Sequence, residues 1–225
     1  MSFFVQEVID EEWGNYFALT TAGYMALVFI MLALLLIGCF IGNSGSKKKF
    51  NTKQLVFSAA AMALGMITSL IKLIDMPMGG SVTLCSMLFI CLIGYWYGFG
   101  GGLLAAISYG FLQLVVDPYI ISLPQMFTDY IFAFGALGLS GIFSNKKHGL
   151  VLGYLLGISG RFVFSFLSGM IFFGSNGASY NMSAAVYSFC YNGAYIGLEG
   201  VITVLILLIP SVSKGLAKVK EMAVQ

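Results

Sequence analysis

Long apolar stretches dominate the sequence and limit the folds open to it. A helix needs about 20 mostly apolar residues to cross a bilayer, and such stretches follow one another between residues 16 and 210. Only 9% of the residues are charged, whereas a soluble domain carries about a quarter. We therefore predict an all-α integral membrane protein, because a helix satisfies its backbone hydrogen bonds within the lipid.

Polar, glycine-rich and proline-containing breaks divide these stretches into seven predicted spans. The first, 16–42, follows an acidic segment (1–15) and precedes a lysine-rich linker (43–51). It lacks the basic start and small-residue cleavage site of a secretory signal, so we predict a retained helix. Six more helices, at about 52–210, form a membrane domain over residues 52–212 that ends in a tail, 213–225. They are expected at 52–72, 82–96, after a glycine-rich turn (98–102) to about 117, 125–143, 149–173 and 184–210.

The basic residues predict the orientation of the spans. With the N-terminus outside and the spans alternating, nine of the eleven basic residues fall on the cytoplasmic side. Cytoplasmic loops of membrane proteins carry such an excess of lysine and arginine. We therefore expect an extracellular N-terminal segment and a cytoplasmic linker and tail. The nine residues are Lys47, Lys48, Lys49, Lys53, Lys146, Lys147, Lys214, Lys218 and Lys220.

Polar side chains gather at similar depths in the later spans. Asp129 lies about a turn inside the span 125–143, and burying a carboxylate there costs about 2.5 kcal/mol or more unless it meets a cation, a donor or water. Intramembrane polar groups mark substrate pathways, and the cytoplasmic half is too apolar for a channel. We predict a ligand pocket open to the outside. Its other polar candidates are Gln125, Tyr130, Arg161, Ser165, Tyr187, Asn192 and Glu199.

A structural ion pair is the alternative explanation for part of this cluster. Buried charges are usually paired, and Arg161 has two candidate partners, Asp129 and Glu199. The sequence leaves both pairings open.

Metal and cofactor chemistry find no support in the sequence. The cysteines lie in apolar runs without ligand spacing, and the one histidine, His148, follows Lys146 and Lys147 in a loop. We expect no metal site, disulfide framework or cofactor. The basic residues lie at helix ends, so we expect a lipid environment and no nucleic-acid partner.

Ala59 and Ala63 lie one turn apart on the first helix of the domain. Small residues at this spacing let another helix approach closely. From the residues alone, packing within the chain is the simpler explanation.

Four short motifs follow one another along the domain. They are Gly79-Gly-Ser-Val-Thr-Leu84, Gln125-Met-Phe-Thr-Asp-Tyr130, Ser168-Gly-Met-Ile-Phe-Phe173, and Tyr187-Ser188 with Tyr191-Asn192. The series, within about residues 50–212, resembles the thiamine-specific substrate-binding (S) component of energy-coupling factor vitamin transporters of prokaryotic plasma membranes. The extra span 16–42 lies outside that family's six-helix core.

The resemblance implies a function and partners. It implies capture of thiamine, or of a close analogue or precursor, from outside, without catalytic activity of the chain itself. Delivery would require a coupling transmembrane subunit, for which Ala59 and Ala63 would form the docking face, and two ATPase subunits that hydrolyse ATP. The alternative is a protein acting alone, as a secondary carrier or a membrane sensor for a small heterocyclic ligand. Ion-driven carriers usually contain internal repeats, and none is clear here.

The resemblance also assigns the binding residues. Asp129 stands where the family usually has Glu, and would face the cationic thiazolium ring of thiamine. Arg161, Ser165 and Phe173 replace an expected Lys, His and Trp. The predicted substrate-binding residues are Gln125, Asp129, Tyr130, Arg161, Ser165, Phe173, Tyr187 and Asn192.

Overall fold

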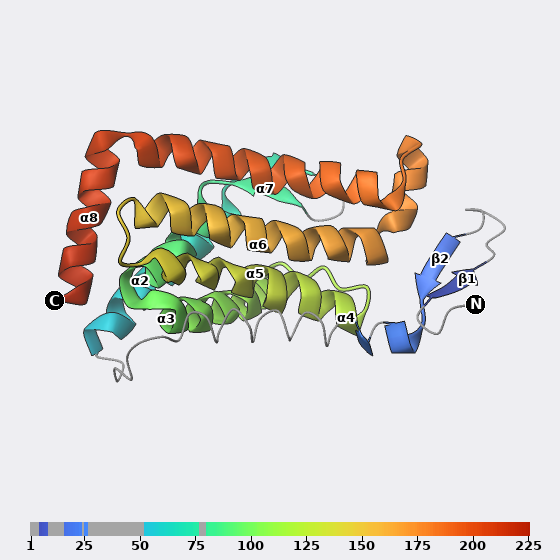
Figure 1. The fold of residues 1–225 in the computed structure, drawn as a ribbon, viewed down its shortest axis with the longest axis horizontal. Coiled ribbons are helices and arrows are strands. Elements are labelled where there is room, and N and C mark those ends of the chain that lie inside the picture. The colour runs from blue at the N-terminus through green and yellow to red at the C-terminus, as the bar shows by residue number, and fades with distance from the viewer. Residues whose placement is uncertain (1–4, 9–15, 24, 27–51, 77–79) are drawn as a thin grey trace.

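The computed structural model describes residues 5–8, 16–23, 25–26, 52–76 and 80–225. Five of its helices are long and apolar enough to cross a membrane, and they lie side by side in one bundle (Figure 1). Four of them are α2 (Thr52–Leu70), α3 (Ser86–Val116), α6 (Gly149–Phe172) and α7 (Ala184–Leu208). The other, Leu123–Phe143, joins α4 (Leu123–Met126), a π-helical segment η2 (Phe127–Phe132), α5 (Ala133–Gly135) and a 3₁₀ segment η3 (Ala136–Phe143).

The helix α3 contains two spans, because the chain reverses at Gly98. This glycine has φ 78° and ψ −176°, a backbone conformation that residues with a Cβ rarely adopt. Beyond it the chain folds back, so that a Cβ on Gly102 would lie 2.6 Å from Cα of Gly94. The predicted glycine-rich turn is therefore confirmed, and the two arms of α3 correspond to two of the six helices expected in the domain.

Glycines let these two arms pack directly on the helix Leu123–Phe143. A Cβ on Gly138 would lie 2.5 Å from Cα of Leu103, and one on Gly141 would lie 2.4 Å from the carbonyl carbon of Gly98. A Cβ on Gly110 would lie 1.9 Å from the carbonyl oxygen of Tyr130. The backbones of the three helices thus touch with almost no side chain between them.

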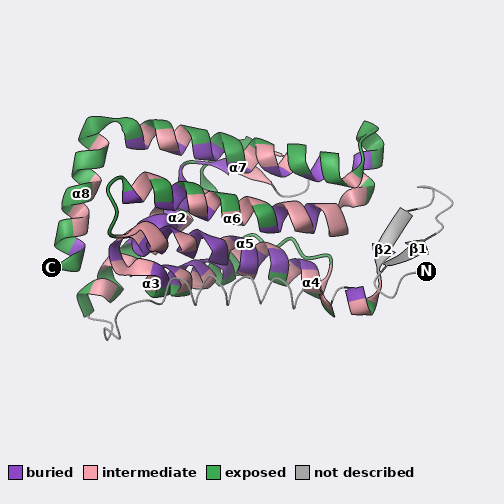
Figure 2. Cartoon of the chain, viewed as in Figure 1, coloured by how far each residue is buried: buried purple, intermediate pink, exposed green. Residues whose placement is uncertain are grey.

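Side chains are buried along α3 and α5 and exposed on the outward faces of α6 and α7 (Figure 2). The fully buried core includes Tyr109, Tyr154, Met87 and Ile93. Many large apolar side chains point outward, for example Leu205 with 61% of its surface exposed. In a bilayer such side chains meet lipid, which is as apolar as they are.

Two short antiparallel strands occupy part of the predicted loop 73–81. These are β3 (Lys72–Asp75) and β4 (Ser81–Thr83), with Lys72 opposite Thr83 and Asp75 opposite Ser81. The helix α3 consequently begins at Ser86, four residues later than the predicted start of the span at 82. The left-handed backbone of Cys85 (φ 57°) breaks the chain direction just before it. Between α6 and α7 the chain forms a 3₁₀ segment, η4 (Gly174–Tyr180).

At the N-terminus the described residues differ from the predicted helix over 16–42. Tyr16–Leu19 forms strand β2, paired antiparallel with β1 (Val5–Val8). Aromatic and β-branched residues favour such a pairing, so a helix does not begin at Tyr16. Residues 21–23 and 25–26 are helical. The rest of that span and the linker 43–51 lie outside the described residues.

The predicted tail is an ordered helix, α8 (Pro210–Val224), which crosses the end of the bundle at a steep angle to α7 (Figure 1). Proline at its start suits the first turn of a helix. One face, with Leu216, Val219 and Ala223, packs against the core. The ammonium group of Lys220 lies 3.7 Å from the centre of the Tyr95 ring and donates to the carbonyl oxygen of Ser144. Burial lowers the pKa of Lys220 below its usual value.

Candidate functional site

A cavity of about 170 Å³ lies among α3, the helix Leu123–Phe143, α6 and α7. It occupies the half of the bundle that contains the first turns of α7, away from the α8 end. All eight side chains predicted to bind substrate line this one cavity. The seven polar residues among them come from distant parts of the sequence and converge, as their matched depths predicted, whereas Phe173 was assigned by the family resemblance. The eight residues are Gln125, Asp129, Tyr130, Arg161, Ser165, Phe173, Tyr187 and Asn192.

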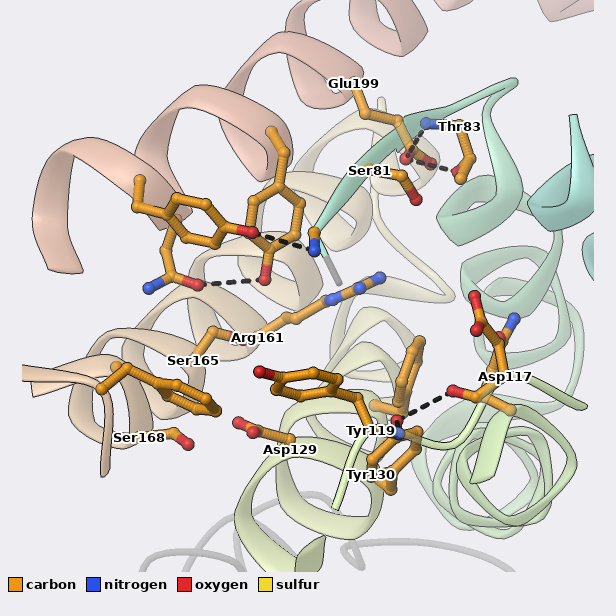
Figure 3. A pocket seen from close by; sticks show the side chains of 18 of the residues that line it. Ser81, Thr83, Asp117, Tyr119, Asp129, Tyr130, Arg161, Ser165, Ser168 and Glu199 are labelled. Carbon is orange, nitrogen blue, oxygen red and sulfur yellow. Dashed lines mark hydrogen bonds between the residues drawn. The ribbon is translucent and has the colours of Figure 1, made fainter. Parts of the chain in front are cut away.

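Asp129 projects into this cavity from the π-helical segment η2 (Figure 3). Its Oδ2 accepts a hydrogen bond of 2.6 Å from Nε2 of Gln125, one turn earlier. The two ion pairs among the described residues are Lys72–Asp75 and Lys72–Asp117, so Asp129 has no cationic partner there. A carboxylate at such a depth is costly unless it meets a cation, a donor or water, and here one amide donor meets it.

Gln125 and Tyr130 tie this helix to the preceding loop. Gln125 is 1% exposed; its Nε2 donates to the carbonyl oxygen of Tyr119, and its Oε1 accepts from the amide of Ile121. The hydroxyl of Tyr130 accepts from the amide of Tyr119 and donates to the carbonyl oxygen of Asp117. These bonds fix the loop 117–121 against the cavity.

Arg161 extends from α6 into the centre of the cavity (Figure 3). Its guanidinium carbon lies 4.3 Å from the centre of the Phe134 ring, an arrangement that stabilises a cation. Neither Asp129 nor Glu199 pairs with it, so the structure realises neither of the two candidate ion pairs. Its buried Nε has no hydrogen-bond partner, and the same is true of the buried Oγ of Ser168, another lining residue. Buried polar atoms rarely lack a hydrogen-bond partner. Both atoms are therefore available to form a hydrogen bond with a ligand.

Glu199 holds the start of α3 instead. It is 2% exposed, and its Oε2 accepts from the amide of Thr83 (3.2 Å) and from its hydroxyl (2.6 Å). Its Oε1 accepts from the hydroxyl of Ser86 (3.2 Å) and the amide of Met87 (3.1 Å). The capping position, Cys85, supplies no side-chain bond. A carboxylate from α7 therefore caps the N-terminus of α3, where the helix dipole favours a negative charge.

A glycine on α6 lets α7 approach the cavity. A Cβ on Gly169 would lie 2.3 Å from Oγ of Ser188 and 2.9 Å from Nδ2 of Asn192. Asn192 is positioned on both sides: its Nδ2 donates to the carbonyl oxygen and to Oγ of Ser188 (2.9 and 3.1 Å), and its Oδ1 accepts from the hydroxyl of Tyr195 (3.0 Å).

Aromatic rings form a second group of lining residues. Phe173 stacks on Tyr119 with ring centres 5.9 Å apart and 27° between the ring planes. Tyr187 stacks on Tyr191 at 5.8 Å and 22°. The hydroxyl of Tyr191 accepts a bond of 2.9 Å from the amide of Gly80, beside strand β4. The cavity thus offers flat apolar surfaces beside its charges.

The cavity reaches the surface at Lys72 and Asp117. Their side chains line it, are partly exposed, and form an ion pair of 3.2 Å. The hydrogen bond to Asp117 raises the pKa of Lys72 above its usual value.

Several lining residues were not among those predicted. Tyr119 lies in a loop with no polar pattern, and Lys72 was placed at the end of a span. Tyr191 and Ser168 occur in the motifs quoted above, and the four-residue spacing of Tyr187, Tyr191 and Tyr195 on one helix face was the signal for that group. Five others also lie in those motifs, although nothing in the sequence distinguished them: Gly80, Ser81, Thr83, Gly169 and Ser188. The remaining ones lie outside the motifs: Ser69, Ser86, Gln113, Asp117 and Phe134.

Comparison with known proteins identifies the family. The thiamine transporter ThiT of Bacillus subtilis (strain 168) is 30% identical over 166 residues, which cover 68% of this chain and 84% of that protein. The solved structure of ThiT from Listeria monocytogenes shares the fold, with a TM-score of 0.58 and 24% identity over 71% of this chain and 96% of that one. The model of the thiamine transporter protein (Thia_YuaJ) family matches residues 55–218. The chain is therefore a multi-pass membrane protein of the thiamine transporter family.

Proposed function

We propose that this protein is the substrate-capture subunit of an energy-coupling factor importer and that it binds thiamine, or a close analogue or precursor, from outside. The observation that carries the proposal is the charge of the cavity. Its lining includes two cationic side chains, Lys72 and Arg161, and three anionic ones, Asp117, Asp129 and Glu199, a formal net charge of −1. A ligand with one positive charge would neutralise it.

Among these acidic groups, Asp129 is the one that a ligand would meet. Asp117 is paired with Lys72, and Glu199 is occupied by four donors from the hairpin and α3. Asp129 has one amide donor and faces the cavity. The thiazolium ring of thiamine is permanently cationic, and its attraction to a carboxylate is strongest where the dielectric constant is low.

The remaining groups fit the rest of such a molecule. The stacked rings of Phe173 and Tyr119 and of Tyr187 and Tyr191 offer faces and edges to flat heteroaromatic rings. The unpartnered Oγ of Ser168 and Nε of Arg161 can bond to polar ligand atoms. Tyr187 and Asn192 would supply the hydrogen-bonding pair of the last long helix.

Calorimetry with the purified protein tests the proposal. We expect thiamine to bind at one site per chain without ATP, because a single cavity contains the countercharge, the rings and the hydrogen-bonding groups. Riboflavin and biotin, which lack a fixed positive charge, serve as controls and should not bind. Clear binding of either control, with no heat from thiamine, would sink the assignment.

The coupling partners are part of the same proposal. We infer that a coupling transmembrane subunit docks on α2 and that two ATPase subunits drive release of the vitamin inward. Ala59 and Ala63 are exposed on α2, whereas Ala61 and Gly65 of the same helix face the core. A helix from a partner could therefore approach this face closely. The proposed orientation places the N-terminus outside and α8 in the cytoplasm of a prokaryotic cell.

Bulky substitutions on this face should separate binding from transport. We expect Ala59→Trp or Ala63→Trp to abolish thiamine uptake in cells that contain the coupling module, while calorimetric binding stays unchanged. Leu205→Trp, on the lipid-exposed face of α7, is the matched control and should transport normally. If both alanine variants also transport normally, the docking face lies elsewhere. Uptake by the protein alone in liposomes, driven by an ion gradient, would favour a secondary carrier.

A further inference from the structure

Tyr180 lies outside the cavity but in contact with its wall. It is the last residue of η4, and 52% of its surface is exposed. Its ring stacks on the cavity-lining Tyr187 with centres 5.6 Å apart and 18° between the planes. Because Tyr187 covers one face of the ring, we infer that much of the exposed surface of Tyr180 belongs to the opposite face.

Tyr180 is the outer end of a column of aromatic rings. From Tyr187 the column continues to Tyr191 at 5.8 Å and to Tyr195 at 5.7 Å. These three tyrosines are four residues apart on α7 and so lie on one face of the helix. All three line the cavity. The column therefore leads from an exposed loop into the site.

The turn that presents Tyr180 is well fixed. The amide of Met182 donates to the carbonyl oxygen of Gly177 (2.9 Å), and Asn181 adopts the left-handed conformation that ends η4. A Cβ on Gly177 would lie 3.1 Å from Cβ of Tyr187. The hydroxyl of Ser183 then caps α7 by accepting from the amide of Val186. The ring is thus pre-ordered, so a ligand that meets it has little side-chain entropy to remove.

We propose that the open face of Tyr180 is a docking site where a cationic heteroaromatic ligand stacks before it enters the cavity. This inference rests on the proposed function. A tyrosine face attracts a cation and a flat ring together. The ligand still touches Tyr180 while it passes the end of the column, and it loses this contact once it is bound at Asp129.

This position has a kinetic consequence that a membrane-anchoring role lacks. A contact made during entry, but absent from both the free and the bound state, stabilises only the barrier between them. Its loss slows association and dissociation by the same factor and leaves the dissociation constant unchanged. A tyrosine that only anchors the loop at the lipid–water interface would affect neither rate.

The test measures thiamine association and dissociation rates on the full-length protein, immobilised in nanodiscs. For Tyr180→Ala we expect both rate constants to fall about 2- to 5-fold, the range for an exposed cation–π contact, with the dissociation constant unchanged. Tyr180→Phe and Tyr180→Trp should restore both rates. Met182→Ala, an exposed neighbour in the same loop, should have no effect.

Other outcomes would overturn the docking site. Unchanged rates in Tyr180→Ala would leave only an anchoring role. A faster dissociation with an unchanged association rate would make Tyr180 part of the bound state. Absence of thiamine binding by the wild type would remove the proposed function and the docking site with it, whereas the first two results would leave that function intact.

Discussion

Asp129→Asn is expected to weaken thiamine binding by about 2–5 kcal/mol, the usual cost of removing one member of a desolvated charge pair. Asparagine keeps the size of the side chain, and its Oδ1 can still accept the bond from Nε2 of Gln125. The loss is therefore the countercharge alone. Calorimetry of the variant with thiamine and with its neutral pyrimidine fragment measures it. The fragment lacks the thiazolium ring and should bind as it does to the wild type.

Two comparisons make this result decisive. Asp129→Glu keeps the charge and should retain most of the affinity. If Asp129 served chiefly to order Gln125 or to balance Arg161 at a distance, Asp129→Asn would lower thermal stability and weaken both ligands alike. Equal losses for thiamine and the fragment would discard the countercharge role.

Glu199→Ala is expected to lower the free energy of unfolding more than it weakens ligand binding. The change leaves the amides of Thr83 and Met87 without their acceptor, and each buried unsatisfied donor costs about 1–3 kcal/mol. The hydroxyls of Thr83 and Ser86 already lie 2.7 Å apart and can bond to each other. We expect a loss of about 2–6 kcal/mol, visible as a lower midpoint of thermal unfolding in detergent.

Glu199→Gln provides the graded control. It retains one acceptor oxygen but directs an amide group at donors, so its stability should fall between those of the wild type and the alanine variant. Asp129→Asn should unfold near the wild-type temperature, because its hydrogen bond persists. A Glu199→Ala variant as stable as the wild type would show that the start of α3 does not depend on this carboxylate.

The sequence predicted the helices and the cavity because both depend on strong local signals. Apolar length locates a span, and a polar residue such as Asp129 or Arg161 inside one is rare enough to mark a site. Matching the depths of these residues along antiparallel spans then brought seven of them to one cavity. Gly98 at the turn was similarly clear, because no other residue adopts its backbone conformation at low cost.

The sequence did not predict which groups the buried charged side chains contact. The sequence places Arg161 and Glu199 at matching depths. The carboxylate of Glu199 nevertheless accepts hydrogen bonds at the start of α3, where Cys85 provides no side-chain cap. A buried carboxylate can be satisfied by amides and hydroxyls as well as by a cation, and composition does not distinguish the two. The helix α8 was missed for a different reason: Leu216, Val219 and Ala223 repeat at helical spacing, but lysines between them resemble a solvated tail.

The backbone contacts around Gly94, Gly102, Gly138 and Gly141 should make one half of the molecule stiffer than the other. Where glycines bring main chains into direct contact, no side chains can change rotamer to absorb a displacement, so this half behaves as a stiff block. A Cβ on Gly110 would lie 1.9 Å from the carbonyl oxygen of Tyr130, so the same kind of backbone contact extends to the residue after Asp129, and this carboxylate lies on the stiff block. We therefore expect the motion that admits a ligand to involve the opposite wall of the cavity, where the large side chains of Tyr187, Tyr191 and Tyr195 can change rotamer.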